Sequence, residues 1–125
     1  MKKILLIMDR KILAQALLSE MRDNPDFVFF TEYNYPKATV SADVFRPDAI
    51  LMEVPESKEA TFAECLDACD EVRRILPTCK IILLSPEGDP KIRELTIEAV
   101  RDGRVDDFLY YDTSLQYLIS KLEAL

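Results

Sequence analysis

Short runs of apolar residues alternate five times with segments in which apolar residues recur at helical spacing. The runs are rich in Ile, Leu, Val and Phe, which is typical of strands buried on both faces. They span residues 4–8, 27–31, 49–54, 80–84 and 108–110. The helical spacing predicts helices over residues 11–22, 36–45, 61–76 and 90–101, and a last helix after Ser114. A capping box at residues 61–64 is expected to open the third helix.

This alternation predicts an α/β fold with a parallel sheet covered by helices on both faces. Right-handed crossovers leave few topologies for such a chain. The leading one is the flavodoxin-like (βα)5 fold, a doubly wound, five-stranded parallel sheet of order 2-1-3-4-5. A length of 125 residues suits a single domain over residues 1–125.

Composition excludes several classes of function. A net charge of −7 disfavours direct nucleic-acid binding, and the absence of histidine removes the commonest general base and metal ligand. With 2 glycines, a glycine-rich phosphate loop is not expected. No apolar run is long enough to cross a membrane, and 3 cysteines fit a reduced, cytoplasmic setting. Cys65 and Cys69 share one helix face, where buried core residues are expected rather than a metal or redox pair.

Polar residues follow the strands at the ends that a parallel sheet brings to one rim. Asp9 and Arg10 follow the first strand, Glu53 ends the third, Ser85 follows the fourth and Tyr111 follows the fifth. Ligands of open α/β sheets bind outside these carboxyl ends, at the switch point between strands 1 and 3. We expect the residues to share a shallow cleft. The alternative is that strand ends are simply where polar residues begin.

Four segments, in order, resemble the receiver domain of two-component response regulators. Residues 3–10 resemble its first strand and acidic pair, and residues 46–54 resemble the strand that bears its phosphoacceptor. Residues 80–85 resemble the strand that ends in its hydroxyl residue, and residues 103–111 resemble the segment that leads to its lysine. The resemblance covers essentially the whole chain and implies the same flavodoxin-like fold.

The family transfers a phosphoryl group to an aspartate, with Mg²⁺ bound by carboxylates and a lysine and a hydroxyl holding the phosphoryl oxygens. On this resemblance, Met8 stands in place of the first acid, and Asp9 matches the second. Glu53 replaces the acceptor aspartate, Ser85 matches the hydroxyl, and Tyr111 replaces the lysine.

Three further positions complete the comparison with the family. Phe108 matches the switch aromatic, Pro55 stands where a backbone carbonyl helps to hold the metal, and Asp112 replaces a proline. We therefore expect a degenerate phosphoacceptor pocket, in a protein that is not an enzyme and requires no cofactor. At most a weak Mg²⁺ site on Asp9 and Glu53 would remain.

The role of Glu53 has two interpretations. It could mimic the phosphorylated state in part, with Arg10 or Lys11 as its cation. It could instead point to solvent and hold nothing, which is the expectation preferred here because exposed carboxylates usually contribute little.

The implied function is an atypical receiver domain that acts through protein–protein interaction. Its implied partners are a histidine kinase, a phosphotransfer protein or an output domain. Tyr110 and Tyr117 lie where the family has its docking surface, on helix 4, strand 5 and helix 5, so a homodimer through this face is a further expectation. One rival function is a receiver that still accepts phosphate on Glu53 or Glu56. The other rival is a small-ligand or flavin-binding domain, ranked last because the loop of residues 85–89 is acidic.

Overall fold

The computed structural model describes residues 1–54, 59–111 and 113–125. Strands and helices alternate along the chain as the apolar pattern predicted. Their bounds are β1 (Lys2–Ile7), α1 (Lys11–Met21), β2 (Phe27–Glu32), the 3₁₀ helix η1 (Tyr35–Lys37), α2 (Ala38–Phe45), β3 (Ala49–Glu53), α3 (Glu59–Ile75), β4 (Lys80–Ser85), α4 (Pro90–Arg101), β5 (Asp107–Tyr110) and α5 (Leu115–Glu123).

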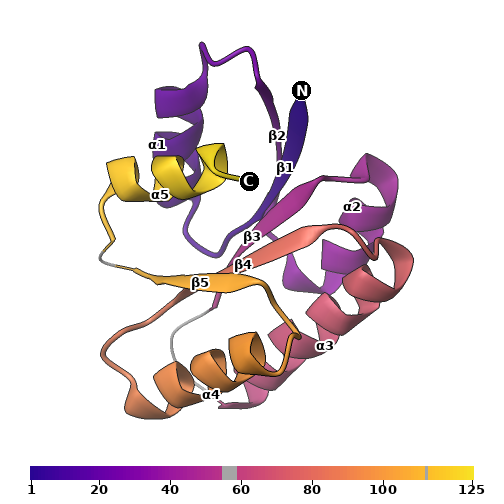
Figure 1. Ribbon diagram of the computed structural model, residues 1–125, viewed down its shortest axis with the longest axis vertical. Helices are drawn as coiled ribbons and strands as arrows, with labels where there is room; N and C mark the ends of the chain where they lie inside the picture. Colours follow the sequence, from indigo (N-terminus) through magenta and orange to yellow (C-terminus); the bar gives the residue numbers. More distant parts are fainter. Residues whose placement is uncertain (55–58, 112) are drawn as a thin grey trace.

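All of the paired strands run parallel, in the order β2-β1-β3-β4-β5. The flavodoxin-like fold and its strand order are therefore confirmed. Helices α1 and α5 cover one face of the sheet, while α2, α3 and α4 cover the other (Figure 1). Ile7 of β1 pairs with Met52 of β3, so these two central strands end side by side at the carboxyl end of the sheet.

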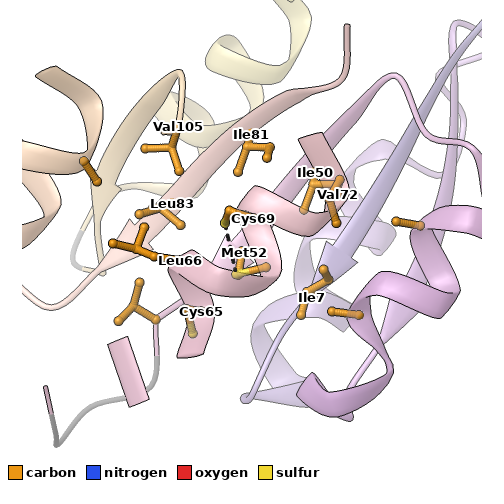
Figure 2. Packing of buried hydrophobic residues seen from close by; sticks show 14 of the residues in the cluster. Ile7, Ile50, Met52, Cys65, Leu66, Cys69, Val72, Ile81, Leu83 and Val105 are labelled. Carbon is orange, nitrogen blue, oxygen red and sulfur yellow. Dashed lines mark hydrogen bonds between the residues drawn. The ribbon is translucent and has the colours of Figure 1, made fainter. Parts of the chain in front are cut away.

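The larger of the two cores lies between the sheet and helices α2 to α4. Figure 2 shows Cys65 and Cys69 of α3 pointing into it, with the Cys69 thiol 3.9 Å from the Met52 sulfur. All three thiols are free and buried, which confirms the prediction for Cys65 and Cys69. Burial raises the pKa of the Cys65 and Cys69 thiols to about 12.

The helix ends agree with the sequence in two places and differ in two others. Asp89 accepts hydrogen bonds from the second and third residues of α4 at 3.1 and 3.2 Å, and Ser114 caps α5. The capping box at Thr61 is wrong, because α3 already begins at Glu59 and the Thr61 backbone is helical. The helix expected over residues 36–45 is divided into η1, which contains Pro36, and α2.

Among the residues that the structure describes, no helix has both the length and the apolarity needed to cross a bilayer.

Candidate functional site at the carboxyl end of the sheet

Glu53, the last residue of β3, is buried with 1 % of its surface exposed. One carboxylate oxygen accepts the backbone N–H groups of Asp9 and Arg10 at 2.8 and 2.9 Å, and the other accepts the Nε–H of Arg10. The expectation that Glu53 points to solvent is therefore wrong. Its physical reason lies in the turn after β1, where two consecutive amides point toward the neighbouring end of β3 and receive the carboxylate.

Arg10 is the cation that holds Glu53. Its side chain is 48 % exposed, and its guanidinium carbon lies 4.5 Å from the centre of the Tyr111 ring. Guanidinium groups are attracted to the face of an aromatic ring, so Tyr111 supports the charge that pairs with Glu53. Lys11, the other candidate, instead places its ammonium 5.2 Å from the Tyr33 ring.

These contacts bring together three of the five residues expected in the pocket. Asp9, Glu53 and Tyr111 line a small hollow of about 100 Å³ together with Arg10. We call these four residues the Glu53 cluster. Met8 is not among them, because its side chain is fully buried in the core beneath α1 and α5.

Ser85 also lies outside the Glu53 cluster, at the end of β4. Its hydroxyl is fully buried and lies 3.1 Å from the hydroxyl of Thr96 on α4, which itself donates to the Ile92 carbonyl at 2.8 Å. Ser85 therefore joins β4 to α4 instead of contacting Glu53. Sequence reasoning missed Thr96, although its place on the buried stripe of α4, between Ile92 and Ala99, marks it as a polar residue in the core.

Tyr35 is a second residue that sequence reasoning missed. Its hydroxyl donates to the backbone carbonyl of Glu53, so it supports the end of β3 from the side of η1. Burial, with smaller effects of Cys65 and Glu53, raises the pKa of Tyr35 well above its ordinary value. The phenol therefore remains a hydrogen-bond donor throughout the physiological pH range. A tyrosine that precedes a proline in a connecting segment gives no signal of this role.

The aromatic residues of β5 and α5 lie beyond the Glu53 cluster. Phe108, the expected switch aromatic, is half-buried and meets the Tyr110 ring edge to face, with 5.4 Å between ring centres. Tyr117 on α5 is 51 % exposed, and the Lys121 ammonium lies 5.9 Å from its ring centre. Tyr117 therefore lies on the surface of α5, while Tyr110 is half-buried at the end of β5.

The carboxylate oxygens in the described part of the site do not fit Mg²⁺, which requires several oxygen ligands in octahedral geometry. Both oxygens of Glu53 accept hydrogen bonds, and Arg10 places a positive charge beside them. Over residues 1–54, 59–111 and 113–125, no three carboxylate or cysteine side chains gather as a metal site. Pro55, Glu56 and Asp112, which the sequence also singled out, lie outside the described residues.

Several solved structures share this fold over the whole chain. A two-component response regulator from Clostridium difficile has a TM-score of 0.78 at 22 % identity, over 99 % of this chain and 94 % of that one. A DNA-binding response regulator of the LuxR family from Staphylococcus aureus gives 0.75 at 16 % identity, over 99 % and 98 % of the two chains. Chemotaxis protein CheY4 from Vibrio cholerae gives 0.76 at 17 % identity, over 99 % and 98 %.

The fold is therefore the receiver-domain fold of response regulators. No protein-family model matches the chain, and no curated protein is similar to it.

Proposed function

We propose that this chain is a receiver-type module of two-component signalling that acts by binding other proteins, without Mg²⁺-dependent phosphorylation of an aspartate. The observation that carries the proposal is the burial of Glu53 against Arg10 at the end of β3. The end of β3 resembles the strand end that bears the phosphoacceptor in receiver domains. In this chain the same place holds an ion pair between Glu53 and Arg10.

The hydrogen bonds of Glu53 oppose its use as a nucleophile. A carboxylate that attacks phosphorus needs a free oxygen aligned with the bond that breaks. One oxygen of Glu53 accepts two amide hydrogens, and the other accepts the Arg10 guanidinium. An attack would require Arg10 to leave, and it would replace the single negative charge of the carboxylate with the nearly two of a phosphoryl group, in a cluster in which Tyr111 replaces the lysine of the family.

The ion pair supports a protein with one fixed conformation rather than a switch. Glu53 and Arg10 are both encoded in the chain, and the Ser85 hydroxyl is already within hydrogen-bond distance of the Thr96 hydroxyl. The cation beside Glu53 supports the other interpretation of this glutamate, a partial mimic of the phosphorylated state with Arg10 as its cation. The setting we propose for the chain is cytoplasmic, and the partners we propose are a histidine kinase, a phosphotransfer protein or an output domain. They would bind on α4, β5 and α5, where Ile97 and Tyr117 are 43 % and 51 % exposed.

Incubation with acetyl phosphate and Mg²⁺, followed by intact-mass measurement, tests the proposal. We expect no adduct of about 80 Da, the mass of one phosphoryl group, while a receiver with the usual aspartate serves as the positive control. A titration with Mg²⁺ followed by tyrosine fluorescence is expected to show no saturable change, since Tyr111 lies in the Glu53 cluster. A stable adduct on Glu53 or Glu56 would contradict the proposal and support the phosphate-accepting alternative.

A further inference from the structure

Strand β2 (Phe27–Glu32) has one free backbone edge. The Met8 N–H donates to the Glu32 carbonyl at 3.1 Å, so Glu32 points its backbone groups toward β1. Successive residues of a strand point these groups to opposite sides. The N–H and C=O groups of Phe29 and Thr31 therefore point away from the sheet, and β2 is its terminal strand in the described part of the chain.

The side chains of this edge are unusually apolar for an exposed strand. All residues of β2 are half-buried, and none carries a charge before Glu32. The rings of Phe27 and Phe29 stack with 6.0 Å between their centres. Exposed strands usually carry lysine, proline or a bulge that prevents another strand from pairing. β2 has none of these features, so its edge is open to an added strand.

A groove beside the edge offers room for the side chains of such a strand. It has a volume of about 480 Å³ and lies between α1 and β2, where its lining includes Leu18, Arg22, Phe27 and Phe29. Phe27 and Phe29 are among the alternate residues of β2 whose backbone N–H and C=O groups point away from β1. In an antiparallel pair, residues directly opposite each other place their side chains on the same face of the sheet. Alternate residues of an added strand would therefore lie over this groove.

The charges at the ends of β2 favour a basic partner over a second copy of the chain. Asp26 precedes the strand and Glu32 ends it, and the whole chain carries a net charge of −7. Pairing of two copies about Phe29 would set Asp26 of each copy opposite Glu32 of the other, and like charges directly opposite are destabilising. A peptide with a basic residue at each end would instead meet Asp26 at one end and Glu32 at the other, where the carboxylate also accepts hydrogen bonds from the Ser41 hydroxyl and the Asn34 N–H.

We propose that the free edge of β2 binds an extended segment of a partner protein as an antiparallel sixth strand, with β-branched residues between two basic residues. The addition of a strand to a sheet edge obtains affinity from main-chain hydrogen bonds and specificity from alternate side chains. This site lies at the edge of the sheet opposite β5 (Figure 1), so it is independent of the proposed surface on α4, β5 and α5.

The probe is the synthetic peptide acetyl-Lys-Val-Thr-Val-Thr-Val-Lys-amide, and amide hydrogen exchange followed by NMR is the measurement. We expect the peptide to slow exchange of the Phe29 and Thr31 amides at least about fivefold, because each gains a hydrogen bond. The Val28 and Phe30 amides face β1 and are expected to change little. No change at Phe29 and Thr31 with millimolar peptide would overturn the proposal.

Altered peptides distinguish strand pairing from non-specific binding without a change in the protein. An N-methyl group on the central valine, which faces Phe29, is expected to weaken binding at least about fivefold. The same group on the preceding threonine points away and is expected to have little effect. Glutamate in place of both lysines is expected to weaken binding about fivefold. Equal affinity of the two N-methyl peptides would refute the register.

A variant of the protein provides the matching test. Thr31→Pro removes an outward N–H together with the threonine hydroxyl and methyl groups, and edge strands tolerate proline at such positions. We expect the variant to keep its circular dichroism spectrum and to lose peptide binding at least about fivefold. Protection of the Phe29 and Thr31 amides in the protein alone, together with a dimer mass by light scattering, would instead assign the edge to a second copy and overturn the peptide proposal.

Discussion

Replacement of Arg10 by methionine keeps the length of the side chain and removes the charge that pairs with Glu53. Glu53 is 1 % exposed and would keep its two backbone hydrogen bonds, but it would lose the bond from the guanidinium. A hydrogen bond to a charged group contributes about 1.5–3 kcal/mol. Loss of one partner from a fully buried pair costs about 3–5 kcal/mol. Because the Arg10 side chain is 48 % exposed, we expect the lower range, about 2 kcal/mol, for Arg10→Met.

Urea denaturation followed by circular dichroism measures this loss. With a urea m-value of about 1.5 kcal/mol per M, the midpoint is expected to fall by roughly 1.3 M. Lys11→Met is the matched control, because the Lys11 ammonium lies over the Tyr33 ring and outside the Glu53 cluster. Its expected change is within about 0.5 kcal/mol.

A double-mutant cycle with Glu53→Gln separates the pair from the rest of the Arg10 side chain. The stacking of Arg10 on Tyr111 contributes about 0.5–1 kcal/mol and is lost in Arg10→Met whatever stands at position 53. The coupling free energy between Arg10 and Glu53 is therefore expected to be about 1–1.5 kcal/mol. A coupling within about 0.3 kcal/mol of zero would refute the argument that this ion pair organises the site.

Two further predictions concern ionisable groups elsewhere in the fold. The Ser41 hydroxyl, which donates to Glu32 at 2.5 Å, is the largest cause that lowers the pKa of Glu32 below its ordinary value of 4.5. A lowered folded-state pKa stabilises the protein above pH 4.5, and this stability is lost as the pH falls through the folded-state value. Urea titrations are therefore expected to show a cost of about 1 kcal/mol for Ser41→Ala at pH 7 that shrinks below pH 4.5; a cost that grows at acid pH would show the opposite linkage. Burial raises the pKa of Cys65, Cys69 and Cys79 to about 12, so iodoacetamide at pH 8 is expected to alkylate them slowly in the native protein and completely in urea. Mass spectrometry counts the adducts, and rapid native alkylation would contradict their burial.

The fold was predictable from the sequence because its central strands are buried on both faces. Continuous apolar runs such as β3 and β4 fit few architectures besides a covered parallel sheet, and right-handed crossovers then fix most of the topology. Helix starts were less certain. The capping pattern at residues 61–64 was present, but helix α3 begins before it, at Glu59. A pattern of residue types does not by itself establish that a side chain caps the backbone.

The site was predictable only in its outline. The topology correctly placed Asp9, Glu53 and Tyr111 at one end of the sheet. The direction of the Glu53 side chain was not predictable, because it depends on two amides in the turn after β1 and on the Arg10 conformation that Tyr111 supports. Ser85 was assigned to the same pocket from its position at a strand end. Its hydroxyl instead points to a threonine on α4 that belongs to a different part of the chain.

The charge pair between Glu53 and Arg10 has a consequence for how long a signal could last. A phosphoryl group on an aspartate is removed by hydrolysis, which returns a receiver to its resting state. Two side chains encoded in the same polypeptide cannot be hydrolysed away, so a module that acts as proposed above would have no chemical timer. Its output would follow the amount of protein that the cell makes and degrades.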